Sequence, residues 1–380
     1  MLFQRDSYSV RSCILIAIII NHAWFSNGEI LDRTKIEDQF HSYVKQYNKK
    51  YESAIEYERR LSIFSDSVLE VEEHNSKNLS WTKKINEFSD MTVEEFKKRF
   101  GGGYVQSPFS PSKSKLTMPS LSELPIHKDW REDDVITPVK SQRCGDCWAN
   151  AATEQIESYL AIETNEPAKV LSVEQIASCS SNAYKCGGTG GCEGGIAQVA
   201  YQYAELFGLV NDTEYPYGKG SMTKECKYNA TEMTSKVFVR GYETLPRNDY
   251  DSIINHVAKV GPLSASIAIA WSDMKAYGGG VYKDCSYDGN IGLNHVVQLV
   301  GYGTDEENGD YWLLRNSWGL TFGDQGYFKF AREKEVRCGE NNTPLGGTAC
   351  VGDGQTIQKV CGMCGVLFDT SYPIGTSKTK

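Results

Sequence analysis

Three short segments, far apart in the chain, constrain its fold more than any other feature: residues 144–148, 294–296 and 316–319. They carry a thiol at Cys147, an imidazole at His295 and a side-chain amide at Asn316. Nucleophilic acyl transfer uses these groups, because the thiol attacks a carbonyl, the imidazole holds its proton and the amide orients the ring. We therefore expect a fold that brings the three segments together, with Cys147, His295 and Asn316 as catalytic candidates.

Each of these residues also has a purely structural explanation. A cysteine in a secreted protein is commonly bridged, and a histidine in an apolar run is commonly a hydrogen-bonded core residue. The occurrence of all three groups, with Trp148 beside the thiol, favours the catalytic interpretation. If Cys147 begins a helix, the helix dipole favours its thiolate, and His295 is then expected to be an imidazolium. Trp318 is expected to shield the bond between His295 and Asn316 from water.

The composition is that of a globular protein. The chain has 380 residues, of which 40% are hydrophobic, enough for two domains and a sizeable core. A net charge of −9 and the lack of a basic run argue against nucleic acid or an anionic membrane as the main partner. No cofactor or metal ion is implied, and a monomer is expected.

An N-terminal apolar run indicates the secretory pathway. Residues 13–20 follow Arg5 and Arg11 and are too few to span a bilayer, so residues 1–25 are interpreted as a signal peptide. A buried N-terminal helix or strand is the alternative. A lysosomal or extracellular location is expected, and four glycosylation sequons agree with it: Asn78, Asn211, Asn229 and Asn341.

The number of cysteines supports one unbridged thiol. Twelve cysteines less Cys13 of the signal peptide leave eleven (12 − 1 = 11), so five bridges leave one thiol over in an oxidising compartment. A zinc site is the competing explanation for some of these cysteines. It is disfavoured because no histidine lies near them.

The chain changes character along its length. Apolar spacing over residues 34–75 predicts two amphipathic helices, and residues 101–119 read as an exposed linker rich in Gly, Ser and Pro. Helical periodicity follows over residues 147–160 and 196–206. Beyond Phe238 the pattern favours strands, notably over residues 263–270, 295–300 and 311–314.

These motifs together resemble the precursors of papain-like cysteine peptidases, of the cathepsin L-like branch, over nearly the whole chain. The separation of Cys147 and His295, 295 − 147 = 148 residues, fits the known pattern of that family. The resemblance implies an α+β, papain-like two-domain fold after a helical propeptide. Its expected parts are a signal peptide over 1–25, an inhibitory propeptide over 26–123, a left helical domain over 124–238 with the nucleophile, and a right β-rich domain over 239–380 with His295 and Asn316.

The resemblance also assigns further site residues. The mature enzyme would begin near Leu124, and the amide of Gln142, with the backbone N–H of Cys147, would stabilise the oxyanion. Gln142 lies five residues before Cys147, where the family has six. Asp146 and Asn150 replace a small residue and an aromatic one, and Asp146 could oppose thiolate formation by like charge.

Substrate recognition is implied at a set of positions around a second subsite. Asp369 is the informative one, because a carboxylate at the floor of that pocket would accept an Arg or Lys side chain. The alternative is that Asp369 points to solvent. The implied substrate-binding residues are Gly194, Gly195, Ile196, Ala197, Ser266, Val296, Trp318 and Asp369.

Two propeptide motifs match the family, although ordinary charged helices would explain the first. The propeptide would act as an intramolecular inhibitor, and acid would favour its removal by protonating carboxylates such as Asp90 and Glu94. The matching residues are Glu56, Arg60, Phe64 and Asn75, with Ser67 and Val71 as departures, followed by Asn86, Phe88 and Asp90.

Family bridges would join three pairs of cysteines: Cys144–Cys192, Cys179–Cys226 and Cys285–Cys364. Four cysteines remain, and three of them lie in an insertion between residues 334 and 363, so two further bridges are expected, one reaching back to Cys186. The pairing among Cys186, Cys338, Cys350 and Cys361 stays open.

These observations predict a cysteine endopeptidase that hydrolyses protein or peptide substrates and is made as an inactive zymogen. A catalytically impaired homologue that acts as a secreted binding protein is the alternative, supported by Asp146, Asn150 and the shortened loop. An exopeptidase would need a segment that blocks one end of the substrate site. The insertion over residues 338–361 is the candidate for such a segment.

Overall fold

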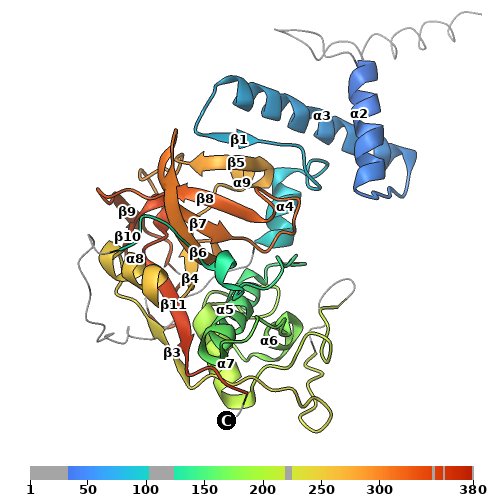
Figure 1. Ribbon diagram of the computed structural model, residues 1–380. Coiled ribbons are helices and arrows are strands. Elements are labelled where there is room, and N and C mark those ends of the chain that lie inside the picture. Colours follow the sequence, from blue (N-terminus) through green and yellow to red (C-terminus); the bar gives the residue numbers. More distant parts are fainter. Residues whose placement is uncertain (1–32, 102–123, 219–224, 345–346, 354–355, 379–380) are drawn as a thin grey trace, which may run out of the picture. The chain divides into compact units, whose positions relative to one another are not determined.

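The computed structural model describes residues 33–101, 124–218, 225–344, 347–353 and 356–378 (Figure 1). The predicted signal peptide and residues 102–119 of the predicted linker lie outside the described residues. The chain divides into two compact units, residues 1–65 and 66–380. Each unit is described by itself.

The described part of the first unit contains the helix α2, Arg33–Gln46, and the first half of α3, Ala54–Ser76. Both helices bury apolar side chains spaced three or four residues apart, which confirms the two predicted amphipathic helices. The ring of Phe64 lies 5.3 Å from that of Phe40 and 4.8 Å from that of Tyr43. Arg60 donates to Glu56 at 2.6 Å on the surface of α3.

A mixed sheet forms the centre of the second unit. Its order is β1-β5-β8-β7-β6-β4-β11-β3, and β2 pairs with β6. A separate two-stranded ladder pairs β9 with β10. The strands are β1 Trp81–Lys83, β2 Lys128–Asp129, β3 Gly241–Thr244, β4 Leu263–Ile267, β5 Tyr277–Tyr282, β6 His295–Asp305, β7 Gly309–Arg315, β8 Tyr327–Ala331, β9 Cys338–Asn341, β10 Gln358–Cys361 and β11 Asp369–Ile374.

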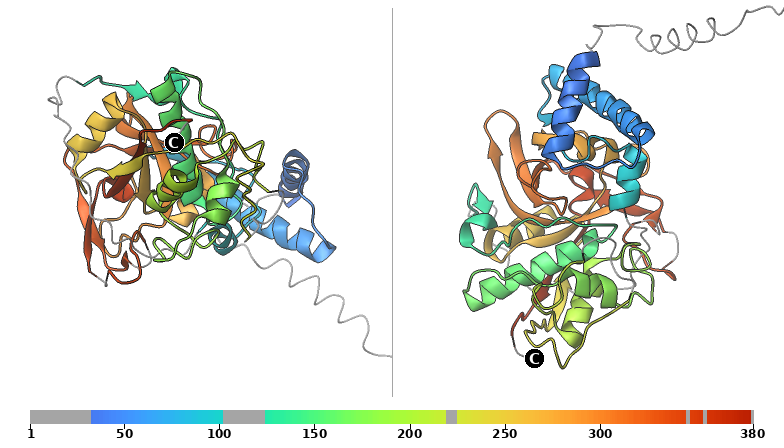
Figure 2. Two further views of the ribbon diagram at one scale, coloured as in Figure 1. Left: turned by 90° about the horizontal axis from the view of Figure 1, so that it is seen from below. Right: turned by 90° about the vertical axis from the view of Figure 1, so that its right-hand side faces the viewer.

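Helices α5, α6 and α7 gather on one side of this unit and most of the strands on the other, as Figure 1 and the right-hand view of Figure 2 show. This confirms the predicted α+β arrangement of a helical half followed by a strand-rich half. The helices of this unit are α4 Val93–Phe100, α5 Cys147–Thr164, α6 Val173–Cys179, α7 Ala197–Phe207, α8 Tyr250–Lys259 and α9 Trp271–Ala276, with short 3₁₀ turns at Trp130–Asp133 and Met363–Gly365.

The strand-rich half also contains two helices that the sequence pattern did not predict, α8 and α9. The side chain of Asp249 caps α8 by accepting from the backbone N–H of Ser252. Ile253, Ile254 and Val257 then turn to the core at helical spacing. The prediction of strands throughout this half was therefore wrong over residues 250–259 and 271–276.

Helix α5 packs against β6, and this contact fixes the two elements that begin with Cys147 and His295. The amide of Gln298, on β6, donates to Gln155 Oε1 at 2.7 Å and to Ser158 Oγ at 3.0 Å, both on α5. These groups are buried, so each bond replaces water that the amide cannot reach. These bonds therefore fix α5 relative to β6, the two elements that begin with Cys147 and His295.

Five disulfides cross-link the second unit. The three bridges implied by the family resemblance are present, and the four remaining cysteines pair as Cys186–Cys350 and Cys338–Cys361. The prediction of two further bridges, one reaching Cys186, is confirmed. Among the described cysteines, Cys147 alone lies outside a disulfide, and bridging of the extra cysteines leaves none of them for zinc.

Two further findings bear on the predicted location. Asn341 is fully buried at the end of β9, so that sequon cannot carry a glycan in the folded protein, whereas Asn78 is exposed. The described residues contain no helix long and apolar enough to cross a membrane.

Candidate active site

Cys147 is the first residue of α5 and is fully buried, which confirms that it opens a helix. The Cys144–Cys192 bridge and the pairing of Gly145 with Glu193 hold the preceding loop. Backbone N–H groups at the start of a helix attract negative charge. The position therefore favours a thiolate once the site opens.

His295 begins β6, and its Nε2 lies 2.8 Å from Asn316 Oδ1. Both side chains are buried, and Trp318 covers them, with its ring 4.9 Å from that of His295. The structure thus places Trp318 where the sequence predicts the shield. The second ring nitrogen of His295, Nδ1, has no hydrogen-bond partner.

Burial lowers the pKa of His295 to about 4, against the opposing effect of the Asn316 hydrogen bond. In this covered state the ring is neutral above that pH, whereas an imidazolium was expected from the sequence. The difference has a physical cause, because the rings of Trp318 and Trp271 enclose the imidazole and exclude the water that would stabilise its charge.

Gln142 joins the segments that carry the thiol and the amide. Its backbone N–H donates to Ser317 O at 2.7 Å, and its Oε1 accepts from Ser317 Oγ at 2.7 Å and Trp318 Nε1 at 3.0 Å. Its Nε2 donates to Cys144 O at 2.6 Å and to Phe100 O at 3.3 Å. The loop that is one residue short therefore still directs the amide into the site.

Asp146, the residue before Cys147, forms a buried polar cluster with two partners, of which Tyr217 was missed from the sequence. Its Oδ2 accepts from the hydroxyl of Tyr217 and, at 3.2 Å, from Asn150 Nδ2. Its Oδ1 is buried without a hydrogen-bond partner. Burial raises the pKa of Asp146 to about 6, and the Tyr217 hydrogen bond only partly offsets this.

Asp369 lies on β11 opposite Ser266 of β4. Its Oδ2 accepts from Ser266 Oγ at 2.6 Å, and its Oδ1 accepts from Gln198 Nε2 at 3.1 Å. Gln198 was missed, since nothing in the sequence links the residue after Ala197 to Asp369. Ile196, Ala197 and Val296 are buried in one cluster.

The Gly194–Gly195 segment lies against the residue that follows the nucleophile. A Cβ on Gly195 would be 2.5 Å from the indole of Trp148, so only glycine allows this approach. The segment therefore forms part of the wall beside Cys147. We define the thiol side of the site as residues 142–150 and 191–198, and the imidazole side as β4, β6, β11 and residues 316–318.

Helix α4 covers the indole that shields His295. Phe96 and Phe100 pack on Trp318, with ring centroids 4.9 and 5.6 Å away. Thr92 caps α4 with a complete capping box, which fixes where the helix begins. Together with the bond from Gln142 Nε2 to Phe100 O, this helix closes the candidate site.

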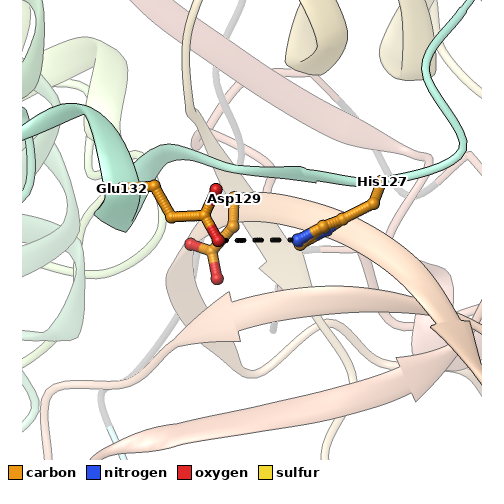
Figure 3. Close-up of side chains that lie close together, drawn as sticks. All are labelled: His127, Asp129 and Glu132. Carbon is orange, nitrogen blue, oxygen red and sulfur yellow. Dashed lines mark ion pairs between the residues drawn. The ribbon is translucent and has the colours of Figure 1, made fainter.

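One group of possible metal ligands occurs among the described residues: His127, Asp129 and Glu132 (Figure 3). Both oxygens of Asp129 accept from Arg131 Nε at 2.9 Å, so its charge is already compensated. His127 Nε2 and Glu132 Oε1 lie 3.9 Å apart and are exposed. This group forms ordinary ion pairs and gives no support for a metal site.

Comparisons with known proteins identify the family of the chain. Residues 124–348 match the papain family cysteine proteases, and residues 40–96 match the cathepsin propeptide inhibitor domain. A cathepsin L-like peptidase of Aedes aegypti is 33% identical over 323 residues, covering 80% of this chain and 91% of the relative. A probable cysteine protease of Arabidopsis thaliana, RDL3, is 36% identical over 313 residues, covering 81% and 78%.

Solved precursors share the fold. Digestive procathepsin L2 from the larval midgut of Tenebrio molitor superposes with a TM-score of 0.72 at 28% identity, covering 89% of this chain and 99% of that one. A recombinant stem bromelain precursor gives a TM-score of 0.70 at 29% identity, covering 90% and 99%. The chain belongs to the papain family of cysteine proteases and carries a cathepsin propeptide inhibitor domain.

Proposed function

We propose that this protein is a cysteine endopeptidase in which Cys147 attacks the peptide carbonyl, His295 transfers the proton and Asn316 orients the imidazole. The observation that carries the proposal is the linked set around Trp318, where one indole contacts His295 and bonds to Gln142. With Nε2 held by Asn316, the other nitrogen of His295, Nδ1, is the one left to take the proton of the thiol.

Gln142 is proposed as the oxyanion donor, together with the backbone N–H of Cys147. Its Nε2 already donates to a backbone carbonyl, that of Phe100, at 3.3 Å. The same donor would serve the carbonyl oxygen of a substrate once Phe100 has left. Such a donor typically contributes about 3–4 kcal/mol to stabilisation of the transition state.

The zymogen state is proposed to depend on residues up to about 123, with the mature enzyme beginning near Leu124. Residues of this segment bond to the strand-rich half: Lys83 to Asp273 at 3.1 Å, and Glu87 to Thr321 at 2.6 Å. These contacts weaken when the carboxylates are protonated, which would favour maturation in acid. Of the two carboxylates named from the sequence, Asp90 is buried whereas Glu94 is exposed.

The second subsite is proposed to accept Arg or Lys through Asp369, besides apolar side chains. A basic substrate residue would replace Gln198 as the partner of the carboxylate. Turnover of Arg-containing substrates should fall in Asp369→Ala while apolar substrates are spared. The same substrate preference in both forms would show that Asp369 does not bind the basic side chain.

The decisive experiment is autocatalytic maturation with an active-site titration. Precursor held in mild acid should lose the segment that precedes Leu124, and a thiol-directed epoxide should then label one site per chain at Cys147. The Cys147→Ala form should neither process itself nor be labelled. Equal processing by both forms, or no labelling of the shortened protein, would favour the alternative of a non-catalytic binding protein.

The location is proposed as a lysosome-like compartment or the extracellular space. Five disulfides are typical of proteins that fold in the oxidising secretory pathway. A mature enzyme recovered from a reducing cytosol with these bridges reduced would contradict the assignment.

A further inference from the structure

The insertion between β8 and β11 is anchored to the imidazole side of the site. Its ends form β9 and β10, where Cys338 lies opposite Cys361 and is bridged to it. Ile291 N donates to Glu340 O at 2.8 Å, which attaches the ladder to the segment that leads into His295. The base of the insertion is therefore part of the strand-rich half.

Residues 347–353 of this insertion, here called the strap, reach residues 184–187 of the helical half. Cys350 of the strap is fully buried and bridged to Cys186, which lies five residues before Gly191 in the helical half. The bridge joins residues 164 positions apart in the sequence. This disulfide therefore links the two halves of the molecule covalently, in addition to the main chain.

Backbone hydrogen bonds flank this bridge on both sides. Gly187 N donates to Ala349 O at 3.3 Å, and Val351 N donates to Tyr184 O at 3.1 Å. The strap is thus paired with residues 184–187 in the manner of a short ladder and cannot swing about the disulfide alone.

Gly195 and Ile196 lie between the strap and Trp148, the residue that follows Cys147. Gly195 packs on Trp148, the neighbour of Cys147. A Cβ on Gly187 would be 2.5 Å from Gly195 O and 2.7 Å from Ile196 Cγ2, so Gly187 packs on this same pair. The strap is bonded to Gly187 and is therefore separated from Trp148 by Gly195 and Ile196.

The other end of the strap meets the segment that leads into β6. A Cβ on Gly347 would be 3.2 Å from Leu293 O, two residues before His295. Cys350 belongs to the same buried cluster as Ile196 and Val296, which line the pocket assigned to the second subsite. The strap therefore runs from residues 184–187 to the segment that leads into His295.

We propose that the strap ends the substrate site after the second residue on the amino-terminal side of the cleaved bond, so that a third and fourth residue add nothing to recognition. This inference rests on the proposed peptidase function. A substrate in extended conformation advances about 3.3 Å per residue, and its third residue would meet the tethered backbone at Gly187 and Ala349. A longer substrate bends into solvent at this point. The enzyme therefore cleaves internal peptide bonds at places where the substrate can bend in this way.

The test uses the matured enzyme, with its active sites titrated, and a series of acetylated peptide substrates. The two residues before the leaving group stay constant, and the peptide is extended with alanine to three and four residues. The expected change in kcat/KM from two to four residues is less than twofold. In the double variant Cys186→Ser/Cys350→Ser, the four-residue substrate should gain tenfold or more over the two-residue substrate.

The double variant Cys179→Ser/Cys226→Ser is the matched control, since it removes a bridge of the helical half that does not involve the strap. Its length dependence should equal that of the unmodified enzyme. A gain of tenfold or more in the unmodified enzyme overturns the role of the strap while the titration still supports the peptidase. That result decides the question even if the Cys186→Ser/Cys350→Ser form does not fold. A protein without a titratable site overturns the proposed function itself.

Discussion

On the imidazole side of the candidate site the buried atom without a hydrogen-bond partner belongs to a neutral ring, Nδ1 of His295, whereas on the thiol side it is a carboxylate oxygen of Asp146. Asn316 forms a hydrogen bond with His295, and the ring of Trp318 covers the imidazole. Asp146, next to Cys147, keeps one carboxylate oxygen without a partner. The comparison shows that the two halves of one site can depend on pH in different ways.

The reason lies in what burial does to each group. Burial disfavours the charged form of both, so it lowers the pKa of His295 to about 4 and raises that of Asp146 to about 6. His295 is therefore neutral in the covered precursor, and Asp146 gains its charge only as the solution approaches neutrality. The charge of Asp146 therefore opposes a thiolate at Cys147 less in acid, where the carboxyl group is protonated.

The largest effect is expected from the imidazole side. His295→Ala should lower kcat/KM of the matured enzyme by at least about 10³-fold, because no other group takes the proton of Cys147. The matched control is His256→Gln, since His256 is also buried, with its pKa lowered to about 3, but bonds to Tyr159 instead. The control should lose stability and keep kcat/KM per titrated site.

Gln142→Ala should lower kcat by about 10²- to 10³-fold, the usual effect of removing one oxyanion donor. The KM should change little, because the donor acts mainly on the charge that develops in the transition state. Steady-state kinetics on titrated enzyme provides the measurement. A change confined to KM would mean that Gln142 only binds substrate.

Asp146→Asn probes the thiol side, and the sign of its effect follows from the raised pKa. The stability linked to Asp146 is fully present below about pH 3.8 and is lost as the pH rises through about 6. The shift corresponds to about 3 kcal/mol of unfolding free energy. We expect the wild-type residue to lose up to this amount relative to asparagine as the pH rises through that window.

Urea unfolding of precursors that carry Cys147→Ala, which cannot process themselves, provides this measurement. Glu154 also titrates in the range, since burial raises its pKa to about 7. Only the difference between precursors with and without the Asp146→Asn substitution therefore isolates the effect. Parallel stability curves would show that the thiol side is as well compensated as the imidazole side.

The smallest effect is expected for Tyr217→Phe. Loss of its hydroxyl removes one hydrogen bond to Asp146, which should cost about 1–3 kcal/mol near neutral pH, where the carboxylate is charged. In acid the cost should shrink, because a protonated carboxyl depends less on this donor. A cost that does not vary with pH would assign the hydroxyl a purely structural role.

The sequence predicts the parts of the site that lie within short motifs. Cys147, His295, Asn316 and Gln142 are recognisable because each stands in its own local pattern, and helix and strand periodicity place the first two correctly on α5 and β6. Contacts between unrelated segments carry no such signal. Nothing local connects Tyr217 to Asp146, Gln198 to Asp369 or Cys186 to Cys350, since these pairs meet only through the fold.

Burial is the second quantity that the sequence does not provide. The sequon at Asn341 has the correct pattern, but pairing of β9 with β10 places that residue inside. In the covered precursor the imidazolium form of His295 is disfavoured for the same reason, because the side chains of residues 271 and 318 surround the ring and exclude water. Local patterns specify which groups are present, and only the packing decides whether they are charged or accessible.

The strand β1 has a consequence for the life of the enzyme after maturation. In the precursor β1 lies antiparallel to β5 and supplies the outermost strand of the sheet. After β1 has been removed, β5 becomes an edge strand whose backbone N–H and C=O groups face water. Exposed edge strands can pair with strands of other molecules. Gly279 and Gly280, with φ of 158° and 84°, break the regularity of this edge strand. The mature enzyme therefore has an irregular edge strand, which disfavours aggregation at high concentration.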